Sequence, residues 1–153
     1  MARILLAAYE SDYPVGERYR AVLLDVAERA REHETWVAAD PEDDRPLGTV
    51  TTGRPGRLIT PTGRPGELDF RLLGVDPAAR RRGVGRALTE HVIALARARG
   101  ASQVVMNSGG QMHPAHRLYE SMGFVVLRER VRVFEDGHVS LAYGIDVRPS
   151  VEG

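Results

Sequence analysis

The stretch from Leu68 to Arg99 sets the strongest limits on the fold of this chain. It reads as a strand over 68–75, a turn over 76–79, a loop over 80–86 and a helix from Ala87 onward. Amides at the N-terminus of a helix have no acceptor inside the helix, and the helix dipole adds partial positive charge there. A strand that leads through such a loop into a helix is therefore suited to bind phosphate.

The composition of the loop strengthens this prediction. Gly83 and Gly85, on either side of Val84, lack a Cβ, so a ligand can approach the backbone closely. Arginine side chains add fixed positive charge and forked donors that suit phosphate oxygens, and the loop carries four of them: Arg80, Arg81, Arg82 and Arg86. We predict a ligand that bears a polyphosphate; the alternative is a surface turn that is merely rich in arginine.

Two common nucleotide-binding loops are excluded. The P-loop requires a lysine after its glycines, and all 21 basic residues of this chain are arginine. The dinucleotide fingerprint requires three glycines as G-x-G-x-x-G, whereas only Gly83-x-Gly85 is present here.

Instead, the loop Arg80-x-x-Gly83-x-Gly85, preceded by Val75-Asp76-Pro77, resembles the acetyl-CoA loop of the GCN5-related N-acetyltransferases. That family's loop reads Arg/Gln-x-x-Gly-x-Gly/Ala. A second family hallmark, Ala-x-x-Leu-Tyr-Glu-x-x-Gly-Phe, is matched over residues 115–124, in the same order along the chain. One departure is Met112, where many members have asparagine and a sizeable subgroup has methionine.

The resemblance implies a fold and an activity. The fold would be a mixed α/β sheet, mostly antiparallel, with a splayed pair of parallel strands and flanking helices, forming one domain over 1–153. The activity would be transfer of an acetyl group from acetyl-CoA, as cosubstrate and without a metal, to an amine of a small molecule or peptide. Since the chain has no cysteine for an acyl-enzyme, we expect direct attack in a ternary complex.

The resemblance also implies roles for particular residues. The backbone of Leu73 and Val75 would pair with the pantetheine arm, the amides of 81–86 and the arginines would bind the pyrophosphate, and His116 would touch a CoA phosphate. Tyr119 would protonate the leaving thiolate, with packing of its ring in the core as the alternative. Asp69 or Glu67 would act as the base, and either could instead be a surface salt-bridge partner.

Hydrophobic periodicity places the remaining elements. We expect a helix at 17–33, a helix through Tyr119 and a terminal β-hairpin about 135–138, with strands at 3–8, 35–39, 47–51 and 102–107. In strand 68–75, alternation places Leu68, Phe70 and Leu72 on the core face and Leu73 on the other. A glycine- and proline-rich loop over 53–66 should be mobile, and with 9–13 and the final hairpin it could line the acceptor pocket.

Composition limits the other functions. The 153 residues suit one compact domain, and the 21 acidic residues balance the 21 basic ones. We therefore expect no binding to nucleic acid or membrane and a cytoplasmic location, while a homodimer stays open. No metal-ligand spacing such as H-E-x-x-H occurs. A non-catalytic acyl-CoA-binding domain on the same fold is the alternative function.

Overall fold

The computed structural model describes residues 33–110 and 112–149. The predicted strand 3–8, the loop 9–13 and nearly all of the predicted helix 17–33 lie outside this part of the chain. The described elements, in chain order, are β1 (Glu34–Ala39), β2 (Pro46–Thr52), β3 (Leu68–Val75), the short 3-10 helix η1 (Pro77–Ala79), α4 (Val84–Ala98), β4 (Gln103–Gly109), α5 (His113–Ser121), β5 (Val125–Val126), the 3-10 helix η2 (Arg128–Arg130), β6 (Arg132–Val133) and β7 (Val139–Asp146).

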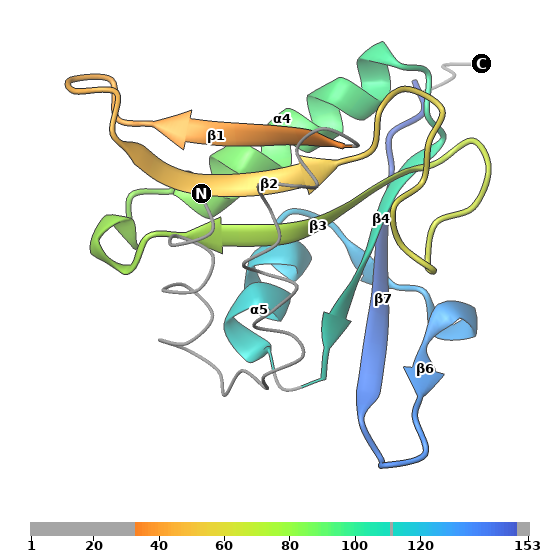
Figure 1. The fold of residues 1–153 in the computed structure, drawn as a ribbon. Coiled ribbons are helices and arrows are strands. Elements are labelled where there is room, and N and C mark those ends of the chain that lie inside the picture. Colours follow the sequence, from red (N-terminus) through yellow and green to blue (C-terminus); the bar gives the residue numbers. More distant parts are fainter. Residues whose placement is uncertain (1–32, 111, 150–153) are drawn as a thin grey trace.

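The strands form one mixed sheet in the order β1-β2-β3-β4-β7-β5, and β6 also pairs with β7 (Figure 1). The β3–β4 pair is parallel, and the other described pairs are antiparallel. β3 and β4 are in register only at Leu68–Val104 and Asp69–Val105, and beyond these residues the two strands diverge. The expected mixed α/β sheet with a splayed parallel pair is therefore confirmed.

A β-bulge in β3 corrects the predicted alternation of that strand. Thr49 pairs with Gly74 and Thr51 with Arg71, so that two residues of β3, Leu72 and Leu73, lie opposite one residue of β2. Leu72 has a positive φ of 57°. A bulge shifts the side-chain alternation by one residue. Leu73 therefore packs against the main core, contrary to prediction, and Leu72 is buried outside it.

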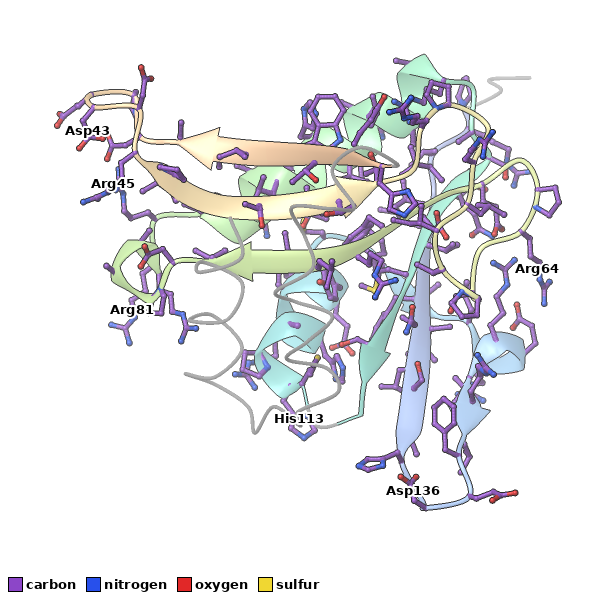
Figure 2. All side chains as sticks on the ribbon, in the orientation of Figure 1. Asp43, Arg45, Arg64, Arg81, His113 and Asp136 are labelled. Atoms are coloured by element: carbon purple, nitrogen blue, oxygen red, sulfur yellow. The ribbon has the colours of Figure 1, made fainter. Side chains whose placement is uncertain are left out.

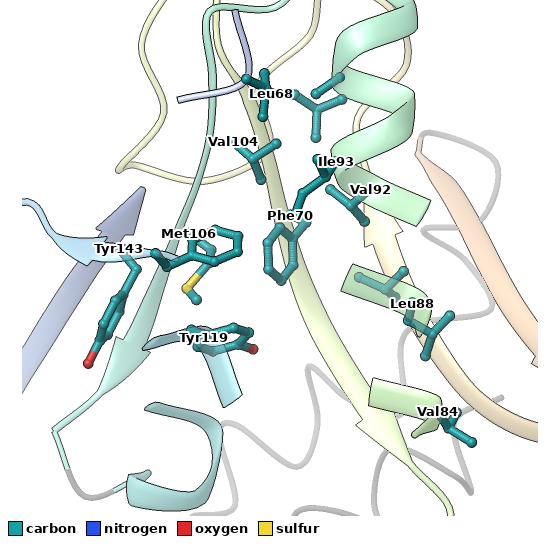
Figure 3. Packing of buried hydrophobic residues seen from close by; sticks show 14 of the residues in the cluster. Leu68, Phe70, Val84, Leu88, Val92, Ile93, Val104, Met106, Tyr119 and Tyr143 are labelled. Atoms are coloured by element: carbon teal, nitrogen blue, oxygen red, sulfur yellow. The ribbon is translucent and has the colours of Figure 1, made fainter. Parts of the chain in front are cut away.

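The core lies between the sheet and two helices. α4 packs against β1, β2 and β3 and buries an apolar stripe that includes Leu88 and Val92 (Figure 3) as well as Ala96. Gly100, just beyond the C-cap Arg99, has a left-handed φ of 72°, as is common for the glycine that follows a helix. Tyr119 of α5 packs in the same core.

The terminal hairpin is confirmed near its turn, where Val133 pairs with Val139. Its first strand is not continuous, however, because η2 separates β5 from β6. Each of these short strands pairs with β7, so the hairpin still closes that side of the described sheet.

Candidate functional site

A cleft of about 1110 Å³ opens where β3 and β4 diverge. Its wall is formed by residues of both strands, the turn before α4, the first turn of α4, α5 and the tip of the β6–β7 hairpin. The lining includes Phe70, Leu73, Val75, Arg80, Arg81, Gly83, Val84, Gly85, Arg86, Met106, Ser108, Met112, Leu118, Tyr119, Phe134 and His138. Residues that are far apart in sequence, including both matched motifs, thus meet at one site.

The predicted phosphate loop lies at one end of this cleft, with a helix that begins earlier than predicted. α4 starts at Val84 rather than Ala87, and Gly83 is its N-cap, with a left-handed φ of 75° and no side chain to occupy the first-turn amides. The Gly83 carbonyl accepts the Ala87 amide at 3.0 Å. The preceding amides of an α-helix have no acceptor within it. These amides, with no acidic side chain in the first turn of α4, are suited to accept an anion.

The two glycines of the loop serve different purposes. A Cβ on Gly83 would meet no atom within 4 Å, so this position needs glycine because of its φ. A Cβ on Gly85 would lie 3.3 Å from Cδ2 of Leu118 and 3.7 Å from Cγ2 of Val75. Gly85 therefore lets α4 approach α5 and β3 closely, in addition to lining the cleft.

The four arginines of the loop do not share one environment. Arg80, Arg81 and Arg86 line the cleft, and Figure 2 shows the Arg81 side chain extending outward from the turn between β3 and α4. Arg86 donates to Ser121 Oγ at 3.0 Å. Arg82 instead pairs with Asp40 at 3.2 Å. The Glu42 amide, and after it Arg82, hold the pKa of Asp40 below its usual value.

The strand segment predicted to hold pantetheine forms one wall. Leu73 and Val75 both line the cleft. Because β3 has no β4 partner after Asp69, the edge of this segment that would face β4 borders the cleft instead. The backbone groups on such an edge are available to pair with an extended ligand.

For Tyr119 we predicted contact with the leaving thiolate or, as the alternative, packing of its ring in the core. Its ring packs among Phe70, Phe124 and Tyr143, with centroid distances of 6.1, 5.7 and 6.0 Å, and the residue is 5% exposed. It also lines the cleft, as does the turn before α4. Core packing and a place beside a bound ligand are therefore compatible here.

The two carboxylates considered as a base have other partners. Asp69 is fully buried and accepts hydrogen bonds from the Ile59 amide and from the amide and hydroxyl of Thr60, at 2.7–3.1 Å. Glu67 accepts two hydrogen bonds from Arg130, at 2.6 and 2.9 Å, in a buried ion pair rather than a surface one. Neither carboxylate is among the described residues that line the cleft. This environment argues against proton exchange with an acceptor.

These contacts also hold the 53–66 loop, which was predicted to be mobile. Besides the bonds to Asp69, the Gly53 carbonyl accepts from Arg99, the Thr62 carbonyl from Arg130 and the Gly66 carbonyl from the Ser102 amide. Thr60 and Pro61 reach the cleft. The loop is therefore tethered along its length, and part of it lines the cleft as expected.

His116, for which the resemblance implies a contact with a CoA phosphate, is buried and is not among the described residues that line the cleft. It is 7% exposed, and its Nε2 is 3.2 Å from Oγ of Ser108 on β4. Burial lowers the pKa of His116 below its usual value, and the nearby His113 adds to this effect. Sequence reasoning missed Ser108, whose only signal was a polar residue at the end of a β-branched strand.

Two further results concern the described residues alone. Between 33 and 149, Gln111 aside, the structure contains no group of three or more His, Asp or Glu side chains arranged to hold a metal ion. The same residues form no helix with the length and hydrophobicity that a membrane span requires.

Comparison with known proteins shows a similarity that reaches beyond the two matched motifs. The model of the Acetyltransferase (GNAT) family matches residues 1–124. Mycothiol acetyltransferase from Beutenbergia cavernae is 38% identical over 102 residues, covering 63% of this chain and 32% of that protein. The chain spans about a third or less of the length of the curated relatives it matches.

Solved structures show the same fold over almost the whole chain. An acetyltransferase of the GNAT family from Desulfovibrio desulfuricans has a TM-score of 0.73 and 23% identity, covering 95% of this chain and 92% of its own. An aminoglycoside 6'-N-acetyltransferase complexed with coenzyme A has a TM-score of 0.69 and 12% identity, covering 99% and 91%. At such identities the likeness concerns the fold.

Proposed function

Because the chain belongs to the acetyltransferase (GNAT) family, we propose that it transfers the acetyl group of acetyl-CoA to a primary amine of a small molecule or peptide. The observation that carries this proposal is the cleft between β3 and β4, whose lining includes both the Gly83-capped start of α4 and Tyr119.

The residues at the start of α4 fit a diphosphate. The amides of Val84, Gly85 and Arg86 are in the first turn of α4, and a left-handed Gly83 leaves their approach open. Arg80, Arg81 and Arg86 supply positive charge at the same end of the cleft. Arg82, paired with Asp40, contributes its backbone rather than its guanidinium.

The edge of β3 fits the rest of an extended thioester. The backbone of Leu73 and Val75 would pair with the pantetheine arm as an added strand does. An amide in the same segment would donate to the thioester carbonyl oxygen and stabilise the negative charge that develops on it. Because β3 has no β4 partner after Asp69, the backbone of this edge is accessible to such a ligand.

Tyr119 would protonate the leaving thiolate. A phenol ordinarily titrates near pH ~10 and a thiol near ~8.5, so a neutral tyrosine beside sulfur can act as the acid. Since the chain has no cysteine, the amine would attack the thioester directly while both substrates are bound. Asp69 would act as the anchor of the 59–60 segment rather than as the base.

The acceptor is expected to be a small amine that enters from the side of the cleft lined by Thr60, Pro61, Phe134 and His138. Because relatives are named for mycothiol and one structural neighbour for aminoglycosides, the amine precursor of mycothiol and an aminoglycoside are the first acceptors to test. A peptide with a free N-terminus belongs on the same panel.

The test has two arms. Calorimetry with CoA measures binding, and a thiol-release assay with acetyl-CoA measures transfer to a panel containing mycothiol without its acetyl group, an aminoglycoside and an N-terminal peptide. We expect CoA to bind and at least one amine to be acetylated. Binding without thiol release on any amine would favour a non-catalytic acyl-CoA-binding domain, and absence of binding would contradict the proposal.

A further inference from the structure

One pair of buried polar side chains in the cleft wall has no part in the function as described so far. Ser108 lies near the end of β4 and lines the cleft, while His116 lies behind it on α5 and is not among the described lining residues. Each is 7% exposed, and Ser108 Oγ is 3.2 Å from Nε2 of His116. The hydroxyl therefore connects a buried imidazole to the cleft.

The splay of the sheet places this pair at the cleft. β3 and β4 separate after the Asp69–Val105 pair, and Ser108 is three residues further along β4. Its backbone is held by β7, in register with Leu141. The Met112 sulfur lies 3.6 Å from Ser108 Oγ and is a weak hydrogen-bond acceptor. Of these two contacts of the Ser108 hydroxyl, the imidazole nitrogen of His116 is therefore the stronger acceptor.

The surroundings of His116 favour the neutral ring. Burial lowers its pKa and the proximity of His113 lowers it further, while the Gly109 backbone and the Glu120 carboxylate act in the opposite direction. The Tyr143 ring of β7 packs on the imidazole, with centroids 5.4 Å apart, and His138 at the tip of the hairpin lines the same cleft. A neutral imidazole keeps a lone pair that can accept a proton.

We propose that Ser108 and His116 form a proton relay that accepts a proton from the acceptor amine during the acetyl transfer proposed above. Ser108 contacts the amine, and His116 acts through Ser108. This inference rests on the proposed function and supplies the base that Asp69 and Glu67, held by Thr60 and Arg130, are not placed to provide.

The amine nitrogen forms a bond to the acetyl carbon, the bond from that carbon to sulfur breaks, and its electron pair stays on sulfur. The proton lost by nitrogen passes to Ser108 Oγ as the hydroxyl proton of Ser108 passes to Nε2 of His116. Tyr119 protonates the sulfur, and a proton returned from His116 through solvent restores Tyr119.

The first test measures kcat against pH for the acceptor from the panel that turns over fastest, at saturating acetyl-CoA, in the wild type, Ser108→Ala and His116→Gln. We expect each variant to lower kcat by roughly 10²-fold, the lower end of what a general base contributes. The KM for acetyl-CoA should change by less than about twofold, since neither side chain would bind the diphosphate. The double variant should lose no more than either single one, because the two groups act as a unit.

The pH profile separates this role from a structural one. The wild-type kcat should fall at pH values below the ordinary 6.5 of histidine, as His116 becomes protonated and can no longer accept a proton. His116→Gln keeps a polar side chain but cannot titrate, so this decline should disappear. His91→Gln, a change at an exposed histidine on α4 whose ring lies tilted against Trp36, is the matched control and should leave the profile unchanged.

Several outcomes would overturn the relay while leaving the proposed function intact. These are full activity in both variants, an acidic decline that survives in His116→Gln, or an acetyl adduct on Ser108 after incubation with acetyl-CoA alone. Failure of the wild type to bind CoA or release thiol would instead contradict the proposed function. Nitrogen NMR of the wild-type imidazole needs no variant: an unprotonated Nε2 at neutral pH is expected, and a protonated Nε2 would refute the relay.

Discussion

The buried carboxylate of Asp69 accepts both the backbone amide and the side-chain hydroxyl of Thr60, each at 2.7 Å. This double contact joins the middle of β3 to the loop that precedes it, and Thr60 in turn lines the cleft. A carboxylate that accepts hydrogen bonds from buried donors stabilises the fold, because its removal leaves those donors unpaired. We therefore assign Asp69 to the stability of the fold rather than to proton transfer.

Replacing Asp69 with alanine should lower the free energy of unfolding by about 3 kcal/mol, because the Ile59 and Thr60 amides lose their buried acceptor. Asp69→Asn keeps one oxygen and should lose less. Urea unfolding measures both, with Asp43→Asn as the control at an exposed carboxylate that accepts the Arg45 amide. A large loss of kcat in Asp69→Asn at unchanged stability would instead identify Asp69 as the base.

Alanine at Gly83 should weaken CoA binding by about tenfold, equivalent to ~1.4 kcal/mol. The new Cβ meets no atom of the described residues within 4 Å, but a φ of 75° strains an L-residue and would shift the amides proposed to bind the anion. Gly100→Ala is a matched control, with a φ of 72° and equally open space at the other end of α4. It should cost similar stability without changing the CoA affinity measured by calorimetry, and equal affinity losses in the two variants would contradict a site at Gly83.

Phenylalanine at Tyr119 should lower kcat by about 10²-fold while the KM for acetyl-CoA changes little. The phenyl ring preserves the contacts with Phe70, Phe124 and Tyr143, so the change removes chiefly the hydroxyl. Steady-state kinetics at saturating acceptor measure the effect. An unchanged kcat would remove Tyr119 as the acid, with Phe124→Leu reporting how much a disturbed core alone alters turnover.

The sequence predicted those features that local chemistry determines. The bounds of β3 and the helix through Tyr119 follow from periodicity and from residues with few backbone options. The start of α4 was misplaced because Gly85 is a weak helix former, and its fit against Leu118 depends on contacts that local propensity does not include.

The features that were missed arise from tertiary structure. Strict alternation placed Leu72 in the main core. The pairing with β2 instead produces a bulge, after which the side chains of β3 point to the opposite faces from those predicted. Asp69 looked available as a base because its burial depends on how the preceding loop folds back over it. Ser108 and His116 are on different elements, and only the packing of α5 against β4 brings them together.

The buried pair Glu67–Arg130 should give stability that depends on pH. Burial acts to raise the pKa of Glu67, but hydrogen bonds from Arg130, Gln103 and the Arg64 amide outweigh it and hold that pKa below the ordinary 4.5. A depressed pKa means that this stability is present above pH 4.5 and is lost as the pH falls through the folded-state value. Glu67→Gln should therefore remove about 3 kcal/mol of unfolding free energy at neutral pH by leaving Arg130 buried without its partner, and much less in strong acid.

Glu129→Gln is the matched control, since its exposed carboxylate lies 4.0 Å from the same guanidinium, and it should cost under about 0.5 kcal/mol. Urea unfolding across pH measures all three proteins, and parallel curves for Glu67→Gln and the wild type would show that the pair contributes no pH-dependent stability.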